Sequence, residues 1–503
     1  MIDAGLLFNQ FLDILTPGRL LMLAGFSFLG LLCGAMPGIS STMTISLLVS
    51  LTYGMSPFNG MLVLIAAYTA STYGGSLSAT LLNVPGTPAA AATALEAYPM
   101  ALRGEAGRAI GISTLQSFTG GIIGTLILLF SAPLVAELAL KFGPWEYFWF
   151  SIFGIFVCAN LSAGSTIKGL IAGIIGILFS LVGVDPLHGT LRYTFGITQI
   201  EGGISYIPAL IGLYGVAEAL SEFIQTTEGK AIQGKSGVLP PLHQYLRGMW
   251  LTIKVTFLGF LIGALPGTGA NIAAWVGYDH AKRSSKHPEM FGKGNPEGII
   301  GAETANNACC AGVYLPLLTL AIPGDATTAI VLGMMLVHGL RPGPSMWIEQ
   351  PHWIYAVVAI HFASNIMFAL QGFSLAKPMS KILQLPRRAV MTVVIILCTI
   401  GSYAVNSNMF DVYLSFLFGI LGLLMRRFGF DVAPLVLGMV LGDLIDVQFR
   451  RAILTSSYSF LPFFTRPICI ILILILIYLT LKEIPFFRNR FHLLSRRRMK
   501  PNG

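Results

Sequence analysis

At residues 263–271 the chain reads Gly-Ala-Leu-Pro-Gly-Thr-Gly-Ala-Asn, and at residues 34–42 it reads Gly-Ala-Met-Pro-Gly-Ile-Ser-Ser-Thr. Both stretches lie inside apolar sequence. The separation along the sequence from Gly34 to Gly263, which we call the first offset, is close to half the chain. A Pro-Gly pair ends a helix, because proline lacks the helical N–H and glycine tolerates the freed backbone. Inside a bilayer such a break is stable only where it lines a cavity in the protein. A duplicated break therefore indicates the binding site of a transporter.

The composition places the chain in a membrane. It has 503 residues, of which 54% are hydrophobic and only 11% are charged, whereas soluble domains average roughly 25% charged residues. Apolar runs such as 110–131, 166–184 and 466–482 reach the ~20 residues that span a bilayer. We predict an all-α polytopic membrane protein with about 11 full crossings, in a range of about 10–14. The net charge of +9 reflects basic loops of the kind that face the cytoplasm rather than a nucleic-acid surface.

A second pair of breaks supports an internal repeat. Val84-Pro85-Gly86-Thr87 corresponds to Ile322-Pro323-Gly324-Asp325, and the second offset, from Pro85 to Pro323, is slightly larger than the first. The larger offset fits a longer basic loop in the second half. We predict a first transmembrane repeat over 1–225, a cytoplasmic linker over 226–248, a second repeat over 249–450, and an extra helix with a basic tail over 451–503.

The two repeats are predicted to be inverted relative to each other. Loop 54–60 carries no charge, but its counterpart 279–298 is strongly basic, so equivalent loops lie on opposite sides of the membrane. The break at Pro266 has basic sequence on both sides, which favours a re-entrant hairpin with Pro-Gly at its tip over a helix broken in mid-span. This scheme puts the N-terminus in the periplasm and the C-terminus in the cytoplasm, although Arg450-Arg451 does not suit it.

The candidate substrate site lies at the four breaks. Helix N-termini after each Pro-Gly present unpaired N–H groups and the positive end of the helix dipole, which together bind a carboxylate without a buried cation. No Lys or Arg lies in the breaks. The alternative is that the polar residues there are helix caps and small packing residues. The predicted substrate-binding residues are Gly38, Ser40, Ser41, Thr42, Asn83, Gly86, Thr87, Gly267, Thr268, Gly269, Asn271, Gly324, Thr327 and Thr328.

Three further residues are candidates for binding a coupling ion. Asp325 is an acid predicted at membrane depth, which indicates function, but it could equally be an N-cap of the next helix. Asn306 and Asn307 form a polar cluster beside Glu303 in an apolar run. The coupling ion is Na⁺ or H⁺. We expect Glu96, Glu218 and Glu222 to be interfacial, because they lie towards predicted helix ends.

No motif for enzymatic chemistry is found in the sequence. The six cysteines have no metal-ligand spacing, so we expect no structural metal and no cofactor. Cys309-Cys310 is interpreted as a pair of small packing residues rather than a redox site. There is no His-Glu-x-x-His motif and no nucleophile elbow, so an intramembrane enzyme is the disfavoured alternative.

Several motifs together carry a family resemblance. They are Tyr73-Gly74-Gly75-Ser76, the run from Leu81 to Ala90, Tyr98-Pro99-Met100, the run from Gly263 to Gly269, and the late Leu441-Gly442-Asp443 with Phe449-Arg450-Arg451-Ala452. In these motifs the chain resembles the large membrane subunit of the tripartite tricarboxylate transporters.

The resemblance covers nearly the whole chain and has clear implications. It implies a bacterial inner-membrane permease that works with a small four-helix membrane subunit and a periplasmic solute-binding protein. It also implies uptake of a tricarboxylate or dicarboxylate, driven by a Na⁺ or H⁺ gradient, with elevator-type movement. The alternative within transport is a stand-alone ion-coupled carboxylate carrier. No role is carried onto Asp443, Asp446 or Gln448.

Overall fold

The computed structural model describes residues 3–161, 165–224, 239–382 and 387–483. Within these residues the regular secondary structure is helical except for a two-stranded antiparallel hairpin, in which β1 (Gly183–Val184) pairs with β2 (Leu191–Arg192). Seven of the described helices are long and apolar enough to cross a membrane. The prediction of a helical, polytopic membrane protein is confirmed. The seven spans are Pro17–Ala35, Ala106–Ala139, Tyr245–Gly263, His352–Leu375, Arg388–Asn406, Met409–Arg427 and Val432–Thr455.

The chain folds into two compact units, and each unit takes segments from both halves of the sequence. Unit 1 comprises Met1–Leu140 and Ile204–Phe428, and unit 2 comprises Lys141–Gly203 and Gly429–Gly503. Most of the predicted linker 226–248 lies outside the described residues, and its last residues, from Leu242, belong to the helix α11.

Unit 1 holds all four Pro-Gly breaks. Its helices in the first half are α1 (Ala4–Ile14), α2 (Pro17–Ala35), α3 (Ser41–Thr52), α4 (Pro57–Leu82), α5 (Ala90–Leu102), α6 (Ala106–Ala139), α9 (Tyr206–Leu210), the π-helix η2 (Ile211–Val216) and α10 (Ala217–Ile224). Those in the second half are α11 (Leu242–Gly263), α12 (Gly269–Ser284), η3 (Pro288–Met290), α13 (Pro296–Gly312), α14 (Tyr314–Leu320), α15 (Ala326–Val337), α16 (Pro344–Glu349), α17 (His352–Ile382), α18 (Arg387–Asn406) and α19 (Met409–Arg427).

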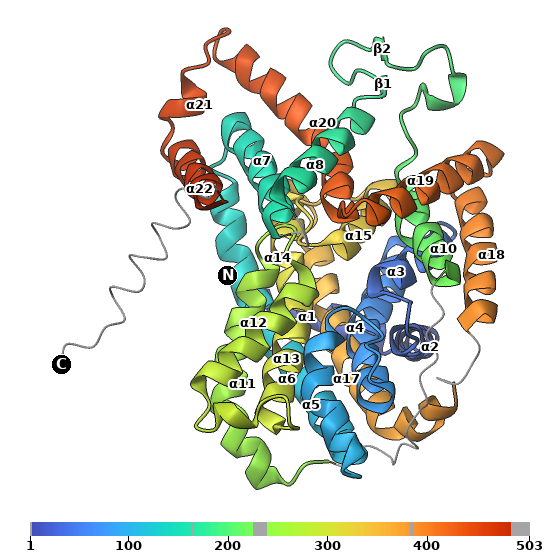
Figure 1. Ribbon diagram of the computed structural model, residues 1–503. Helices are drawn as coiled ribbons and strands as arrows, with labels where there is room; N and C mark the ends of the chain where they lie inside the picture. The colour runs from blue at the N-terminus through green and yellow to red at the C-terminus, as the bar shows by residue number, and fades with distance from the viewer. Residues whose placement is uncertain (1–2, 162–164, 225–238, 383–386, 484–503) are drawn as a thin grey trace. The chain divides into compact units, whose positions relative to one another are not determined.

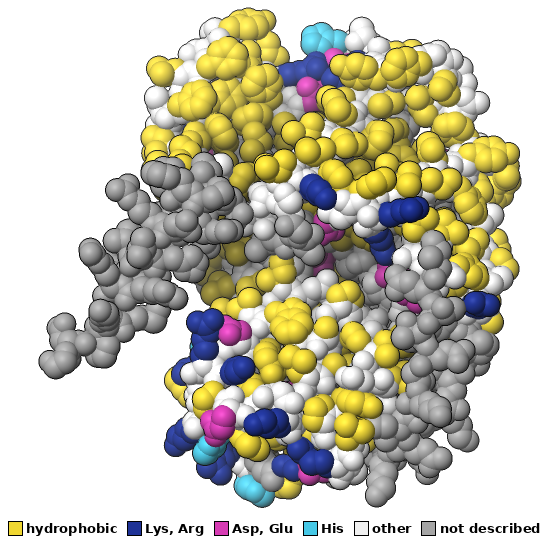
Figure 2. Space-filling model, viewed as in Figure 1, with side chains coloured by type: hydrophobic (Ala, Val, Ile, Leu, Met, Phe, Trp, Pro, Cys, Tyr) yellow, Lys and Arg dark blue, Asp and Glu magenta, His cyan; other side chains and the backbone are white. Residues whose placement is uncertain are grey.

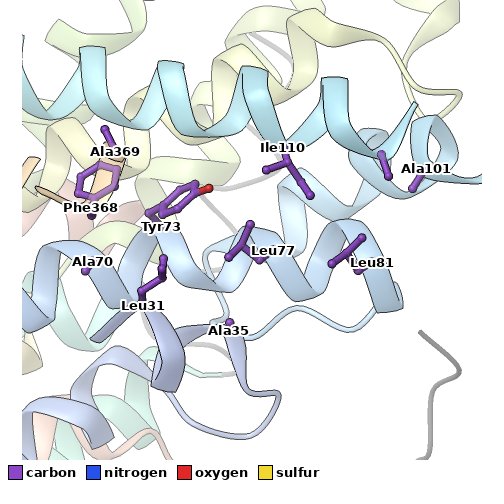
Figure 3. Packing of buried hydrophobic residues seen from close by; sticks show 11 residues of the cluster. Leu31, Ala35, Ala70, Tyr73, Leu77, Leu81, Ala101, Ile110, Phe368 and Ala369 are labelled. Carbon is purple, nitrogen blue, oxygen red and sulfur yellow. The ribbon is translucent and has the colours of Figure 1, made fainter. Parts of the chain in front are cut away.

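The core of unit 1 forms where α2, α4, α6 and α17 meet (Figure 3). Tyr73 of α4 stacks on Phe368 of α17 with ring centroids 5.2 Å apart, and both side chains are fully buried. The Tyr73 hydroxyl is not left without a partner, because it lies 2.6 Å from the hydroxyl of Thr114 on α6. Small residues such as Ala70 let the helix backbones approach closely, which is how helices associate in membranes.

The end of each half of the sequence packs against helices of the other half. Within unit 1, α18 and α19 pack around η2, and a Cβ on Gly212 would lie 2.2 Å from the Ser415 carbonyl oxygen. Within unit 2, α7 (Pro144–Leu161) and α8 (Thr166–Ser180) pack around α20 (Val432–Thr455), as Figure 1 shows. There a Cβ on Gly438 would lie 2.1 Å from the Gly173 carbonyl oxygen. Gly212 and Gly438 hold matching positions in two similar sequence motifs, so the same close crossing is built twice.

Unit 2 also carries a charged cluster beside its hairpin. Arg450 of α20 donates to Asp185 at 2.7 Å and to Asp446 at 2.8 Å, and Arg192 donates to Asp446 at 3.0 Å. The cluster therefore gives Arg450 two carboxylate partners, although Arg450-Arg451 did not suit the predicted topology. The remaining helices of unit 2 are η1 (Thr198–Ile200), α21 (Pro462–Thr465) and α22 (Pro467–Glu483).

Large apolar side chains remain exposed on helices that are long enough to span a membrane. On α6, Phe130 is 61% exposed and Leu134 is 69% exposed, which suits contact with lipid rather than water. Lys and Arg side chains instead gather over the region where Figure 1 places the ends of α5, α11 and α12 (Figure 2). The exposed Lys282, Arg283, Lys286 and Lys293 lie at the end of α12 and in the loop after it.

Candidate functional site

The first break in each half has the backbone that Pro-Gly predicts. α2 ends just before Pro37-Gly38 and α11 just before Pro266-Gly267, and the two glycines have positive φ angles of 91° and 82°. α3 then begins after Ser40, whose hydroxyl accepts the N–H of Met43. This cap satisfies one of the free donors of the helix start. Both predicted helix breaks are confirmed.

The second break in each half uses a left-handed residue to end the helix. Asn83 ends α4 with a φ of 55°, and Ala321, its counterpart at the second offset, ends α14 with a φ of 59°. Asparagine tolerates this conformation, whereas alanine adopts it only under strain. Asn83 is exposed, and its conformation accounts for its residue type without any role in binding.

Close backbone approaches recur at the two sequence offsets. A Cβ on Gly34 would lie 2.0 Å from the Ser71 carbonyl oxygen, and one on Gly263 would lie 2.5 Å from the Cys309 carbonyl oxygen. Glycine is therefore required where α2 crosses α4 and where α11 crosses α13. Two further pairs of glycines leave no room for a Cβ at equivalent positions. Gly30 lies close to the backbone of Ala67, as Gly259 does to that of Ala305. Gly74 lies close to the backbone of Leu31, as Gly312 does to that of Phe260.

Helix N-termini from the two halves meet inside unit 1. The Thr42 hydroxyl at the start of α3 lies 3.0 Å from the Thr327 hydroxyl at the start of α15. The Gly267 N–H, just before α12, donates to the Gly324 carbonyl at 2.7 Å. The starts of α3, α12 and α15 are thus held together by contacts between residues predicted for the substrate site.

Asp325 is both a cap and a partner of a distant helix. Its carboxylate accepts the N–H and the hydroxyl of Thr328, each at 2.7 Å, and forms a capping box at the start of α15. Its other oxygen accepts the Tyr68 hydroxyl of α4 at 2.7 Å. Gly269 packs beside it, since a Cβ there would lie 3.2 Å from the Asp325 Cβ. The capping interpretation of Asp325 is confirmed, and Tyr68 is a contact that the sequence pattern did not indicate.

Equivalent residues of the two halves also touch each other. The Cys310 thiol of α13 donates to the Thr72 hydroxyl of α4 at 3.6 Å, and these residues are related by the second offset. The Ser41 hydroxyl lies 3.5 Å from the same Thr72 hydroxyl. We therefore take this contact between α4 and α13 as the centre of the candidate site.

The Tyr68–Asp325 pair has a counterpart on the other side of this centre. At the second offset Tyr68 corresponds to Asn306, and Thr87 corresponds to Asp325. Asn306, Asn307 and Thr87 are 1%, 0% and 3% exposed. Both amide atoms of each asparagine and the Thr87 hydroxyl have no hydrogen-bond partner among the described residues. Buried polar groups are nearly always paired, so five unpaired atoms in one region indicate a place for a polar ligand.

The contacts of α13 show which part of the helix carries the two asparagines. Residues three, four and seven positions apart share one face of a helix, so Asn306 and Asn307 lie between Glu303 and Cys310. Cys310 bonds to Thr72 of α4, whereas Glu303 accepts from Thr93 of α5. The break that joins α4 to α5 contains Thr87, whose hydroxyl oxygen would lie 2.3 Å from a Cβ on Gly75.

The other predicted residues have local or peripheral contacts. Ser40 donates to Glu218 at 2.9 Å, and Gly38 packs against the Glu222 side chain. The Thr268 hydroxyl donates to the carbonyl of Ile262 in the last turn of α11 and to that of Leu265 just after the helix. Asn271 is exposed. Gly86 has no room for a Cβ, which would lie 2.0 Å from the Gly34 carbonyl oxygen.

Glu96, which was expected to be interfacial, is buried within the protein. Its side chain is 0% exposed and accepts the Tyr278 hydroxyl at 2.8 Å. It also accepts the backbone N–H groups of Gly292, Gly294 and Asn295 at 2.5 to 2.7 Å. All four donors belong to the second half of the chain, so no local pattern could reveal them.

Comparison with known proteins identifies the chain. Residues 20–437 match the model of the tripartite tricarboxylate transporter TctA family. The chain belongs to this family. A relative from Agrobacterium vitis, named "Uncharacterized 52.8 kDa protein in TAR-I ttuC' 3'region", is 36% identical over 455 residues, which cover 90% of this chain and 91% of the relative. A second from the same organism, "Uncharacterized protein in TAR-II ttuC' 3'region", is 36% identical over 233 residues, or 46% of this chain and 96% of that relative. No solved structure matches the chain.

The TctA family is the large membrane subunit of tripartite tricarboxylate transporters, which agrees with the multi-pass fold. Its members are transporter subunits rather than enzymes, and the family implies a tripartite system with two further components. Among the described residues, no group of three His, Cys, Asp or Glu side chains could hold a metal ion. The four breaks and the buried asparagines therefore lie in the permease subunit of a transporter.

Proposed function

We propose that this TctA-family permease imports a tricarboxylate or dicarboxylate, driven by a Na⁺ or H⁺ gradient, together with a small four-helix membrane subunit and a periplasmic solute-binding protein. The single observation that carries the proposal is the group of unpaired buried atoms on Asn306, Asn307 and Thr87 beside converging helix starts. A carboxylate accepts hydrogen bonds from amide N–H₂ and hydroxyl groups. The amide oxygens that remain are suited to a cation such as Na⁺.

The geometry around Asn306 supports binding on one side of the centre. On the other side, Tyr68 reaches Asp325 directly at 2.7 Å. Asparagine is much shorter than tyrosine, and the polar side-chain atoms of the equivalent pair have no hydrogen-bond partner among the described residues. The broken symmetry leaves polar atoms for a substrate carboxylate where the related position holds the Asp325 carboxylate of the protein itself.

We further propose that the repeats are inverted and contain re-entrant hairpins, with about 11 crossings, a periplasmic N-terminus and a cytoplasmic C-terminus in the bacterial inner membrane. The recurring glycine contacts and the Thr72–Cys310 contact support a two-fold relation between the repeats. The uncharged loop 54–60 and its basic counterpart support the inversion. Elevator-type movement follows from the resemblance.

The test is radiolabelled citrate and dicarboxylate uptake into vesicles that contain the permease with its cognate subunits, with Na⁺ and pH gradients imposed separately. Thr87→Val and Asn306→Ala should each raise KM for the substrate at least about tenfold, which corresponds to about 1.4 kcal/mol of lost binding. Thr392→Val is the matched control, because Thr392 is exposed on α18 and bonds only to its own helix. Absence of gradient-driven uptake of every carboxylate, or an unchanged KM in both variants, would refute the proposal.

A further inference from the structure

Glu303 is a carboxylate enclosed by the protein. Its side chain is 0% exposed, and it lies on α13 among helices of unit 1. One oxygen accepts the Thr93 hydroxyl of α5 at 2.5 Å, and the other accepts the Ser117 hydroxyl of α6 at 2.7 Å. The two donors come from the first half of the chain, whereas Glu303 belongs to the second.

No cation balances this carboxylate among the described residues. None of the described ion pairs includes Glu303, and the groups that bond to it are hydroxyls. A buried charge with no partner is costly. The titratable or charged groups on the packed elements are Tyr68 and Tyr73 on α4, Glu96 and Tyr98 on α5, Glu105 just before α6, Arg108 and Glu137 on α6, His243, Tyr245, Arg247 and Lys254 on α11, Tyr278, Asp279, His280, Lys282 and Arg283 on α12, Glu297, Cys309 and Cys310 on α13 itself, and Tyr314 on α14.

The groups on the nearest elements have partners of their own. The Tyr73 hydroxyl lies 2.6 Å from Thr114, and Tyr278 donates to Glu96. Lys254 of α11 lies over the Trp250 ring, with its Nζ 4.9 Å from the ring centroid. A neutral Glu303 therefore requires a proton from outside this cluster.

The hydroxyls around Glu303 can satisfy both of its charge states. A hydroxyl both donates and accepts, so Thr93 and Ser117 can bond to the charged carboxylate and can also accept the O–H of the neutral acid. Ser113 lies one turn before Ser117 on α6 and donates to Ser76 of α4 at 2.7 Å. The same heavy-atom positions thus serve either state without rearrangement of the helices.

The position of Glu303 couples its charge to the substrate site. Asn306 and Asn307 lie one helical turn away on the same face of α13, where side chains three or four residues apart have Cβ atoms about 5–6 Å apart. A carboxylate substrate bound to these asparagines brings a second negative charge close to Glu303. Two like charges at this distance favour protonation of one of them.

We propose that Glu303 binds the coupling proton of this permease, an inference that rests on the proposed carboxylate import. A proton from the outside medium forms an O–H bond with a Glu303 carboxylate oxygen as the substrate binds. The same bond breaks on the cytoplasmic side, where the proton and the substrate are released together. The step moves one proton per Glu303 and needs no oxidant, reductant or other reactant.

The experiment compares wild type, Glu303→Gln and a control, Glu137→Gln, in proteoliposomes with the cognate subunits. Glu137 is an exposed acid of α6. Two activities are measured with the same labelled carboxylate: exchange across the membrane without a gradient, and net uptake driven by an inward proton gradient. Glu303→Gln should keep exchange within about threefold of wild type, lose net uptake at least about tenfold, and show no pH dependence of exchange.

A second variant guards against a purely structural effect. Thr93→Val keeps the acid but removes one donor to its charged form, so the pH profile of uptake should shift to higher pH while maximal exchange is kept. Proton-driven uptake that persists in Glu303→Gln, or uptake driven by a Na⁺ gradient alone in wild type, would overturn the proton assignment and leave carboxylate import standing. If wild type takes up no carboxylate under any gradient, the proposed function fails and this inference fails with it.

Discussion

Glu96 offers a sharp test of how the hairpin α4–α5 is held to the second half of the chain. The change is Glu96→Gln, which keeps the shape of the side chain and removes its charge. The wild-type carboxylate accepts four hydrogen bonds: Oε1 accepts from Tyr278 and Gly292, and Oε2 accepts from Gly294 and Asn295. The glutamine amide has one acceptor oxygen, so its N–H₂ group must face two of these donors.

The cost follows from the bonds that are lost. A hydrogen bond to a charged group contributes about 1.5–3 kcal/mol to stability. Two such bonds are lost outright, which gives a loss of about 3–6 kcal/mol in the free energy of unfolding. The remaining two bonds become neutral and therefore weaker. The substitution should rank with the most destabilising single changes in this protein.

The assay is the half-life of the monodisperse peak in fluorescence-detected size exclusion after heating in detergent, because large membrane proteins seldom unfold reversibly. Glu105→Gln is the matched control, since its ion pair with Arg108 is well exposed and contributes about 0–1 kcal/mol. Glu96→Gln should fail at a clearly lower temperature than both wild type and the control. Equal half-lives for the two variants would refute the role of Glu96 as an anchor for residues 292–295.

Three further predictions concern packing, pH and the site. Gly263→Ala should cost about 1–3 kcal/mol in the free energy of unfolding through overpacking. Gly25→Ala, where nothing lies within 4 Å of the new Cβ, should be neutral or stabilising. Equal effects of the two changes would contradict the close crossing of α11 and α13. Hydrogen bonds from the backbone N–H of Leu187 and, to a smaller extent, from the Arg450 side chain hold the pKa of the Asp185 carboxyl well below its usual range. The stabilisation that the charged Asp185 contributes is therefore complete above about pH 4 and is lost as the pH falls through its folded-state pKa. Asp185→Asn should flatten the acid limb of a pH–stability curve. An unaltered acid limb would exclude this contribution of Asp185. Thr327→Val should raise KM for the carboxylate severalfold with folding retained, as judged by size exclusion, and an unchanged KM would remove Thr327 from the site.

The sequence predicts those parts of the fold that depend on local chemistry. Pro37-Gly38 and Pro266-Gly267 end helices because of their own backbones, and no distant contact is needed for that. The second offset likewise relates Asn83 to Ala321, and both residues end a helix in the left-handed conformation. Asparagine favours that conformation, whereas alanine does not. Internal repetition therefore indicates a feature at Ala321 that the residue type alone does not.

The parts that could not be predicted depend on contacts between distant segments. The end-of-helix position of Glu96 is visible in the sequence, but its partners come from the distant loop before α13. Tyr68 is one of many aromatic residues in apolar sequence, and only the fold brings its hydroxyl to Asp325. The polar cluster at Asn306 and Asn307 was evident from the sequence, whereas the absence of partners around it among the described residues is a property of the packed helices.

The exchange of helices between the two halves has a consequence for how the protein is made. α8 ends at Ser180, but α20, which packs against it, begins only at Val432. At about 5–20 residues per second the ribosome needs roughly ten to fifty seconds to supply the missing partner. During that interval the face of α8 around Gly176, which later meets Leu435 and Gly438 of α20, lacks its partner helix. Completion of unit 2 must therefore follow synthesis of nearly the whole chain, so a ribosome that stalls in the second half leaves behind a product that quality-control proteases can recognise.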